Sequence, residues 1–337
     1  MNNSTHSTTA PVSLADIYSA RQRIAGVVLH TPLLPFHTLS QDGVAVWLKP
    51  EQFQPIGSFK LRGAYNRLAA LSDAERQRGV IAYSSGNHAQ GVAYAARRLG
   101  LRAVIVMPNN APAVKIAATR GFGAEVITYD PLTERREVIA AALIATDPLT
   151  LVPPFNDPYV IAGQGTIGLE IAEALPAVDL VLLPVGGGGL LSGTATAIKS
   201  LRPGAQVIGV EPELAADAQA SLHSGQIVEI SNAEASRTIA DGVRTLAVGP
   251  LTLAQMQHYV DDIVTVSEAE LYSAWYRLLT DAHLLVEPTS ALPLAAWLYH
   301  RDLLPDARQV VIVLSGGSID PAQIGDLLRL VADQGVR

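Results

Sequence analysis

One lysine in an apolar turn is the first feature of this sequence that could do chemistry. The segment 57–64 places Lys60 between Phe59 and Leu61, directly after a glycine-containing turn. A lysine becomes a catalyst when burial lowers its pKa or when its amine forms a Schiff base. A surface lysine whose stem lies along apolar neighbours gives the same pattern. The segment by itself leaves both interpretations open.

Four consecutive glycines follow the apolar run 180–183, which predicts a buried strand, and precede a predicted helix over 194–201. They are Gly186, Gly187, Gly188 and Gly189. The backbone N–H groups of such a loop converge on an anion at a helix N-terminus, where the dipole favours negative charge. A flexible turn is the alternative, but flexible turns rarely follow a buried strand directly, so the pattern favours a phosphate site. The loop lacks the Gly-Lys-Ser/Thr ending of a P-loop and the fingerprint of a dinucleotide site.

A polar loop between the predicted strand 80–83 and the predicted helix 90–99 offers a second set of donors. Its residues are Ser84, Ser85, Gly86, Asn87 and His88. Hydroxyls, an amide and backbone N–H groups suit a carboxylate or a phenolic oxygen, and they equally make a good helix N-cap. For His88 the pattern favours a hydrogen-bonded structural role over that of a catalytic base.

A third loop brings a serine to the end of the predicted strand 310–314. Ser315 is followed by two glycines and Ser318, and ligands of α/β folds collect at this end of the strands. Ser315 could hydrogen-bond a ring nitrogen without forcing that nitrogen to stay protonated; capping of the next turn is the alternative. A reactive lysine, a phosphate loop, an amide-bearing loop and a serine at a strand end are together what pyridoxal phosphate requires.

Strands that alternate with helices position these loops. Further β-rich runs lie at 44–49, 103–107, 126–129, 150–152 and 207–210, and further helices are predicted from 13, 113 and 135. This alternation indicates parallel sheets built from right-handed crossovers. Two such series, separated near Asn156 where Pro153 and Pro154 interrupt the pattern, predict two α/β domains with the chemistry between them. The segment 215–248 predicts only loop and short helix.

The composition narrows the classes of function. The chain has 337 residues, 49% of them hydrophobic and 16% charged, which is enough interior to bury a cofactor. No apolar run approaches the roughly 20 residues of a membrane span, and a net charge of −7 without basic clusters argues against nucleic acid as a partner. The absence of cysteine excludes disulfides, thiolate catalysis and cysteine-based zinc sites. We expect a soluble, cytoplasmic protein whose polar first segment, 1–12, is disordered and is not a signal peptide.

From about Leu14 onward, the chain resembles the fold-type II pyridoxal-phosphate enzymes of the serine/threonine dehydratase and serine racemase family. The resemblance is carried by five ordered segments, which are 57–64, 84–91, 162–166, 186–189 and 314–317. It implies a two-domain α/β fold like that of the tryptophan synthase β subunit, with mainly parallel sheets flanked by helices. It also implies a large cofactor-binding domain of residues 1–65 and 155–337, and a small domain, 66–154, that closes over the substrate.

The resemblance also implies a role for each loop. Lys60 carries the Schiff base with pyridoxal phosphate, Phe59 packs beside the ring, and Ser315 meets the pyridine nitrogen. Asn87 bonds the phenolic oxygen, and the four glycines bind the phosphate. Ser85 corresponds to a second acid/base on the ring face opposite Lys60.

Substrate contacts follow from the same resemblance. The residues implied are Ser84, Ser85, Gly86, Asn87 and His88, which hold the substrate carboxylate, together with Arg136 and Asn156, which face the substrate. The family usually reads Ser-Gly-Gly-Asn after the last strand, whereas this chain has Ser318 in place of the asparagine. That departure puts the local support of the ring nitrogen in doubt.

The segment 209–217 resembles the divalent-metal loop of serine racemase-like members. Glu211, Asp217 and the carbonyl of Ala215 supply hard oxygen ligands suited to Mg²⁺ or Ca²⁺. Without the resemblance, the same residues would be interpreted as an ordinary exposed acidic loop.

The implied activity is that of a dehydratase (ammonia-lyase) that converts a β-hydroxy amino acid to a 2-oxo acid and ammonia. Candidate substrates are L-threonine, L-serine, 3-hydroxyaspartate and a hydroxyectoine breakdown product. Serine racemisation is the alternative, because it needs only reprotonation from the opposite face. A non-catalytic pyridoxal-phosphate binding protein is the alternative from a different class, although the presence of both Lys60 and Ser85 argues against it. We expect a homodimer and, because Arg337 follows soon after the last predicted helix, no C-terminal regulatory domain and no isoleucine feedback through one.

Overall fold

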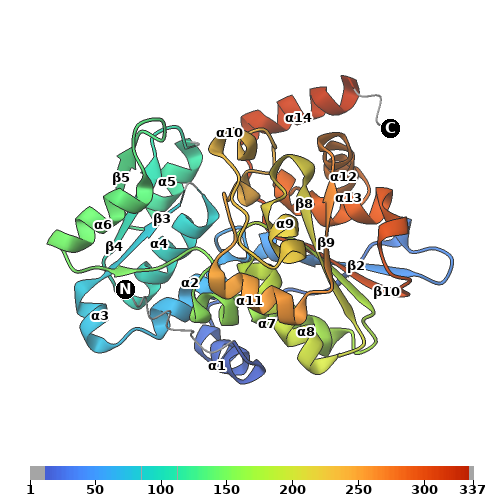
Figure 1. Cartoon of the computed structure of the whole chain (residues 1–337), viewed down its shortest axis with the longest axis horizontal. Helices are drawn as coiled ribbons and strands as arrows, with labels where there is room; N and C mark the ends of the chain where they lie inside the picture. The colour runs from blue at the N-terminus through green and yellow to red at the C-terminus, as the bar shows by residue number, and fades with distance from the viewer. Residues whose placement is uncertain (1–11, 85, 112, 334–337) are drawn as a thin grey trace.

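Two sheets flanked by helices form the fold (Figure 1). The computed structural model describes residues 12–84, 86–111 and 113–333. Within these ranges the larger sheet has six strands in the order β1-β2-β10-β7-β8-β9, and the smaller has four in the order β5-β4-β3-β6. The predicted α/β class with mainly parallel sheets is confirmed.

The larger sheet combines strands from both ends of the chain. Its strands are β1 (Leu34–Pro35), β2 (Ala45–Pro50), β7 (Leu180–Pro184), β8 (Gln206–Pro212), β9 (Asp262–Val266) and β10 (Gln309–Leu314). β1 pairs antiparallel with β2, and the other neighbouring strands pair parallel. β10 lies between β2 and β7, so the loop after β10 comes close to loops that are distant in the sequence. The sequence pattern did not predict β9.

Alternate residues of the central strands face opposite sides of the larger sheet. In β7, Leu180 and Leu182 belong to the core shared with α12 (Glu268–Thr280) and α13 (Leu292–Tyr299). Val181 and Leu183 pack in the other core, with α8 (Gly189–Leu201) and α11 (Pro250–Tyr259). Burial on both faces explains why this strand reads as a continuous apolar run.

The smaller sheet is built from one continuous part of the chain. Its parallel strands are β3 (Val80–Tyr83), β4 (Ala103–Pro108), β5 (Glu125–Tyr129) and β6 (Thr150–Leu151). Helices α2 (Lys60–Ala69) and α4 (Asn87–Leu99) share a core with one face, and α6 (Arg136–Thr146) shares a core with the other. The loop before α4 therefore lies at the carboxyl end of β3, where α/β folds bind ligands.

Helices α7 (Pro158–Ala174) and α8 pack so closely that their contact requires glycine. A Cβ atom on Gly193 would lie 2.2 Å from the carbonyl oxygen of Ile161, and one on Gly165 would lie 2.8 Å from the carbonyl oxygen of Gly193. α8 starts at Gly189, earlier than the predicted position 194. The weak helix propensity of glycine suggests a later start, but tertiary packing outweighs it.

The remaining helices surround these layers. They are α1 (Leu14–Ile24), α3 (Asp73–Arg78), α5 (Ala113–Gly121), α9 (Asp217–Ser224), α10 (Asn232–Ala235) and α14 (Pro321–Asp333). α1 starts with the predicted capping box, in which Ser13 and Asp16 each accept a hydrogen bond from the other's backbone N–H. Among the helices in the described ranges, none combines the length and the apolar character needed to cross a membrane.

Candidate active site

Lys60 is the first residue of α2 and is held next to the end of β10. The backbone N–H of Phe59 donates to the carbonyl oxygen of Ser315 at 3.0 Å. Lys60 Nζ donates to the carbonyl oxygen of Pro154 at 2.9 Å and lies 5.1 Å from the centre of the Phe59 ring. Burial lowers the pKa of Lys60 to about 8, against the opposing effect of the Glu287 charge. A far larger fraction of this amine is therefore unprotonated near neutral pH than in a surface lysine, and only the unprotonated amine can act as a base or nucleophile.

The glycine loop lines the same pocket as Lys60. Gly186, Gly187, Gly188 and Gly189 all belong to this lining. The loop leads from β7 into α8, and Gly188 has a φ of 88°, in the left-handed region that favours glycine. A Cβ atom on Gly187 would lie 2.2 Å from the ring of Phe155. The backbone thus approaches the pocket without side chains, at the positive end of a helix dipole.

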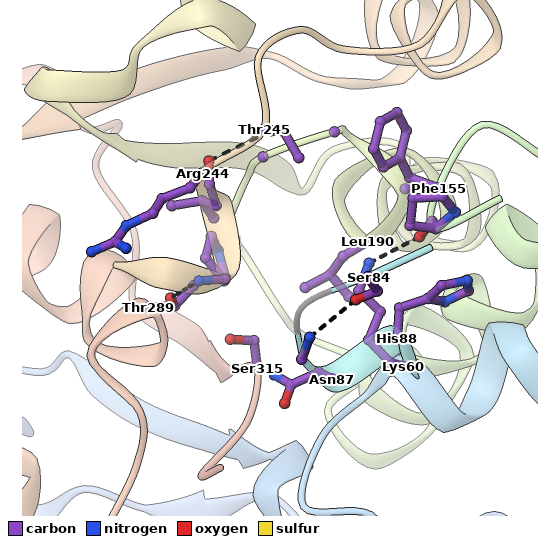
Figure 2. Close-up of a pocket in the computed structure, with 18 of the residues that line it drawn as sticks. Lys60, Ser84, Asn87, His88, Phe155, Leu190, Arg244, Thr245, Thr289 and Ser315 are labelled. Carbon is purple, nitrogen blue, oxygen red and sulfur yellow. Dashed lines mark hydrogen bonds between the residues drawn. The ribbon is translucent and has the colours of Figure 1, made fainter. Parts of the chain in front are cut away.

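The loop before α4 turns polar groups toward the same hollow (Figure 2). The lining residues here are Ser84, Gly86, Asn87 and His88. His88 Nε2 lies 3.0 Å from the carbonyl oxygen of Val152, and because a carbonyl can only accept, the ring proton is on Nε2. Burial, followed by the charge of Lys60, lowers the pKa of His88 to about 3, so the ring is neutral and structural. Ser85, the expected second acid/base, lies outside the described residues.

Ser315 closes the pocket at the end of β10. Its side chain is buried, and its Oγ lies 3.1 Å from Ser290 Oγ. Ser318 lies instead beside Gly57, where a Cβ atom would be 3.2 Å from Ser318 Oγ. Ser290, which sequence reasoning did not single out, therefore supports Ser315 from behind.

Two acids and a second lysine also line the pocket, and sequence reasoning missed all three. Asn87 Nδ2 donates to both carboxylate oxygens of Glu287, at 3.0 and 2.9 Å, and burial raises the pKa of Glu287 to about 7. Lys115 Nζ lies 2.5 Å from Asp241 Oδ2, which joins α5 to the η4 turn (Asp241–Val243). A signal was present, because Lys115 and Glu287 both stand in apolar runs, as Lys60 does.

The structure separates the two residues that were expected to face the substrate. Arg136 lines the pocket, with its guanidinium 5.2 Å from the centre of the Tyr83 ring and 2.8 Å from the carboxylate of Glu137. Asn156 is not among the lining residues. Its Oδ1 accepts a hydrogen bond from the backbone N–H of Leu251 at 2.9 Å, so its amide fixes a loop turn beside the pocket.

Comparison with known proteins bears directly on this pocket. A sequence profile of the family described as "Pyridoxal-phosphate dependent enzyme" matches residues 24–316. The chain belongs to this family. The fold-type II pyridoxal-phosphate enzymes are therefore the class to which this chain belongs.

Individual known enzymes resemble this chain over nearly its full length. An L-threo-3-hydroxyaspartate ammonia-lyase of Saccharomyces cerevisiae is 45% identical over 93% of this chain and 95% of that protein. A serine racemase of Schizosaccharomyces pombe is 42% identical over 90% of this chain and 94% of that protein. The structure of the processed form of a threonine deaminase of Solanum lycopersicum superimposes with a TM-score of 0.85 at 37% identity, covering 95% of each chain.

The pocket residues fit pyridoxal phosphate chemically. The pocket lining combines an amine, backbone donors and apolar side chains such as Phe59 and Val185, which is the mixture found in small-molecule sites. Lys60 offers a primary amine with a lowered pKa, and the glycine loop offers backbone donors for a phosphate. Asn87 Oδ1 is buried and has no hydrogen-bond partner among the described residues, so this oxygen can accept a hydrogen bond from a ligand hydroxyl.

Gly187→Ala should weaken the binding of pyridoxal phosphate, because the added Cβ must displace the Phe155 ring. We expect a loss of roughly tenfold to a hundredfold in affinity, since overpacking of this kind costs about 1–3 kcal/mol. Gly204→Ala is the matched control, because no heavy atom lies within 4 Å of that Cβ position. Cofactor titration of the stripped proteins measures both affinities, and equal values for the two variants would contradict the role of the loop.

The predicted metal ligands are buried, which excludes an exposed acidic loop. Glu211, Ala215 and Asp217 are each no more than 1% exposed. The carboxylate of Glu211 accepts from the N–H groups of Ala218 and Gln219, whereas neither carboxylate oxygen of Asp217 has a hydrogen-bond partner among the described residues. Burial raises the pKa of Glu211 well above its ordinary value and that of Asp217 to about 7. Unpaired buried carboxylate oxygens of this kind suit a hard divalent cation.

The candidate metal site offers few protein ligands. In the described ranges, no group of three or more His, Cys, Asp or Glu side chains is arranged to hold a metal ion. Two carboxylates and a carbonyl oxygen would need water molecules to complete the coordination of Mg²⁺ or Ca²⁺.

Proposed function

We propose that this protein eliminates water from a β-hydroxy amino acid and releases a 2-oxo acid and ammonia. The observation that carries the proposal is the arrangement of Lys60, the glycine loop and Ser315 around one pocket. The ammonia-lyase and the threonine deaminase among its relatives support the same chemistry. Serine racemisation is the second candidate, supported by the racemase relative.

Each pocket residue would have its own role in this reaction. Bound pyridoxal phosphate would supply an electron sink that acidifies the α-C–H bond of the substrate. The glycine loop would hold its phosphate, Asn87 its phenolic oxygen, and Ser315 its ring nitrogen. Lys60 would hold the cofactor covalently and, once released, accept the α-proton at Nζ, for which a pKa of about 8 is well suited.

The net reaction balances without a further reactant. The α-proton and the β-hydroxyl leave as water, and a second water molecule replaces the amine with oxygen, which releases ammonia. The N-terminus of α4 supplies backbone donors and a dipole suited to the substrate carboxylate, with the Ser84 hydroxyl beside it.

Arg136 supports a preference among the candidate substrates. Of the basic side chains that line the pocket with Lys60, Lys115 is paired with Asp241, whereas Arg244 donates to the neutral carbonyl oxygen of Thr238 and has no ion-pair partner among the described residues. Arg136 pairs only with the adjacent, partly exposed Glu137, among the described residues. A substrate with a second carboxylate could displace that weak partner, so we propose L-threo-3-hydroxyaspartate as the preferred substrate over L-threonine and L-serine.

A screen of 3-hydroxy amino acids of both configurations tests this function. Release of 2-oxo acid and ammonia from L-threo-3-hydroxyaspartate, with lower kcat/KM for L-threonine, is the expected result. Chiral analysis of the remaining amino acid detects racemisation, and D-serine formed without 2-oxo acid would favour the racemase. Cofactor that is fixed to Lys60 by borohydride, without turnover of any substrate, would leave a non-catalytic binding protein.

We propose that residues 66–154 form a small domain that closes over the substrate, against a large domain of residues 1–65 and 155–337. The four strands of the smaller sheet lie within 80–151, and the Lys115 and Asp241 pair would link the two domains at the pocket. We further propose a homodimer in the cytoplasm. Sedimentation analysis of the purified protein would test the dimer.

We also propose that Glu211, Asp217 and the Ala215 carbonyl bind Mg²⁺ or Ca²⁺. Without the cation, stability should fall as the pH rises from about 4 to about 7, because the folded-state pKa of Asp217 is raised to about 7 and that of Glu211 is raised as well. The protonated forms, which prevail below the ordinary carboxyl pKa, keep the full stability. The cation needs the ionised forms, so its effect should be largest above pH 7.

Thermal unfolding measures this prediction. At saturating Mg²⁺ above pH 7 we expect Tm to rise by about 5 °C or more relative to protein in EDTA. Asp217→Asn should remove most of that rise, and at acidic pH the cation should have little effect. An unchanged Tm at every pH would remove these residues from the metal site.

A further inference from the structure

Thr252 contacts the glycine loop from outside the pocket. It lies in the first turn of α11, is fully buried, and is not among the pocket-lining residues. Its Oγ1 donates to the carbonyl oxygen of Gly187 at 2.8 Å, and a Cβ atom on Gly188 would lie 2.9 Å from Thr252 Cβ. Gly187 and Gly188 both line the pocket. The loop therefore lies between the pocket and α11.

The neighbouring backbone groups indicate where the hydroxyl hydrogen of Thr252 is directed. Its Oγ1 also lies 3.0 Å from the carbonyl oxygen of Gly249 and accepts from the N–H of Gly249 at 2.9 Å. The Gly249 carbonyl already accepts from the N–H of Leu253 at 2.8 Å. Among the described residues, the Gly187 carbonyl has no donor other than this hydroxyl. A hydroxyl carries one hydrogen, so a bond to Gly187 gives each of these carbonyl groups a donor.

The direction of the Gly187 carbonyl fixes the direction of the next N–H group. The peptide bond between Gly187 and Gly188 is trans, so this carbonyl and the N–H of Gly188 point in opposite directions. Because the carbonyl is directed at Thr252 in α11, the N–H is directed to the pocket side of the loop. The backbone hydrogen bonds of the described residues give this N–H no protein acceptor. It is therefore available to an anion in the pocket.

We propose that Thr252 is a positioning residue that turns the N–H of Gly188 toward the phosphate of the cofactor. This inference rests on the proposed role of the glycine loop in holding that phosphate. Without the hydroxyl, the Gly187 carbonyl would be buried without a donor, which is costly. Rotation of the peptide, which two flanking glycines permit, would relieve that cost but would turn the carbonyl toward the phosphate. Thr252 thus favours the phosphorylated cofactor over its unphosphorylated form.

Titration of the cofactor-free protein with pyridoxal phosphate and with pyridoxal tests the proposal. Both compounds carry the aldehyde that would react with Lys60, but only the first carries a phosphate. Thr252→Val keeps the shape of the side chain and removes the hydroxyl. We expect its affinity for pyridoxal phosphate to fall roughly tenfold to a hundredfold, as the loss of one hydrogen bond to a charged group would produce. Its affinity for pyridoxal should stay close to the wild-type value.

Two variants serve as controls. Thr252→Ser keeps the hydroxyl and should retain the wild-type preference for pyridoxal phosphate. Thr196→Val removes another buried hydroxyl between the same two helices, because Thr196 on α8 accepts from Gln255 Nε2 on α11 at 2.9 Å and does not line the pocket. It should leave both affinities unchanged. Equal losses for the two compounds in Thr252→Val would overturn the proposal, as would a loss that Thr196→Val matches.

The outcomes separate the role of Thr252 from the proposed role of the loop. A wild type that binds both compounds equally well would overturn both. A wild type that prefers pyridoxal phosphate, with the same preference in Thr252→Val, would overturn the role of Thr252 alone. If Thr252→Val does not fold, Thr252→Ser decides, because a lost preference in a variant that keeps the hydroxyl contradicts the proposal. The titration uses no substrate, so it holds whether or not a 3-hydroxy amino acid is turned over.

Discussion

Lys60→Ala should reduce kcat/KM for the preferred 3-hydroxy amino acid by roughly 10³-fold or more, because one side chain would supply both the covalent link and the base. The amine lies in the pocket with a pKa lowered to about 8. After borohydride reduction, the wild type should carry cofactor on the peptide that contains residue 60, and the variant should carry none there.

Lys199→Ala is the control for the loss of a lysine. Lys199 lies on α8 and pairs with Asp261 at 2.7 Å, outside the pocket lining, so we expect activity close to the wild type. If Lys60→Ala keeps the absorbance of covalently held cofactor, the assignment of Lys60 is wrong.

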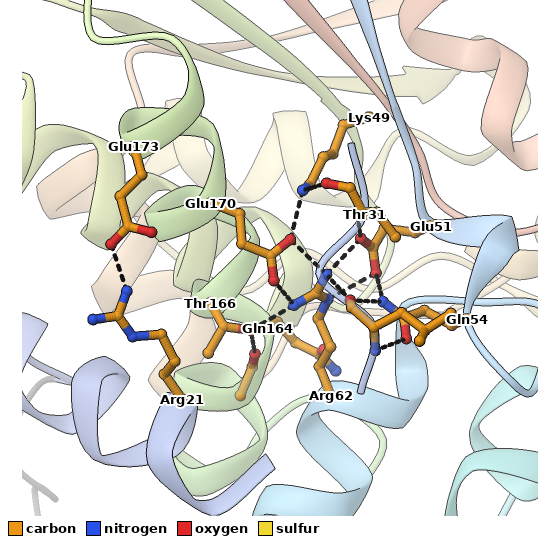
Figure 3. Close-up of polar contacts among 12 residues, drawn as sticks. Arg21, Thr31, Lys49, Glu51, Gln54, Arg62, Gln164, Thr166, Glu170 and Glu173 are labelled. Carbon is orange, nitrogen blue, oxygen red and sulfur yellow. Dashed lines mark hydrogen bonds and ion pairs between the residues drawn. The ribbon is translucent and has the colours of Figure 1, made fainter. Parts of the chain in front are cut away.

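Arg62→Met should lower the free energy of unfolding by about 3–5 kcal/mol, because it leaves buried carboxylates without their partner. The guanidinium of Arg62 donates to both oxygens of Glu51, each at 2.8 Å, and to both oxygens of Glu170, at 2.6 and 2.9 Å (Figure 3). Lys49 Nζ lies 2.5 Å from the carboxylate of Glu170. Burial by itself would raise the pKa of Glu51. The charge and hydrogen bonds of Arg62 have the larger combined effect and hold that pKa below its ordinary value.

Arg21→Met provides the matched comparison, because Arg21 on α1 also pairs with a glutamate of α7. Arg21 pairs with Glu173, one turn beyond Glu170 on α7, but both side chains are about half exposed. An exposed pair of this kind contributes at most about 1 kcal/mol. Urea unfolding of the two variants in parallel should show the difference; equal losses would mean that burial of the network does not matter.

The network also explains the position of Lys60. Arg62 lies in the first turn of α2, two residues after Lys60, and joins that turn to α7 and to the segment after β2. The sequence alone showed a charged residue next to an apolar one. It did not show that four charges meet there, because the partners are distant in the chain.

The sequence predicted well those features that depend on neighbouring residues. Apolar runs bounded by glycine or proline became strands such as β7 and β10, and the order of strands and helices indicated the fold class. The glycine loop and Ser315 were found because each directly follows such a strand, so parallel topology alone brings them to one edge. The boundaries were less accurate at α4 and α8, where Asn87 and Gly189 start the helices earlier than propensity predicts.

Tertiary contacts, which the sequence pattern does not show, determined the other features of the pocket. Glu287 and Lys115 enter the pocket through packing between segments that no sequence spacing relates, and Asn156 turns to Leu251 for the same reason. Lys60 shows both contributions. Its flanking residues and the loops that follow strands identified it as the candidate Schiff-base lysine, whereas burial and the charge of Glu287 set its pKa near 8. The local sequence pattern shows which residue types are present. The distances between side chains and their desolvation, which set pKa values and reactivity, arise only in the folded chain.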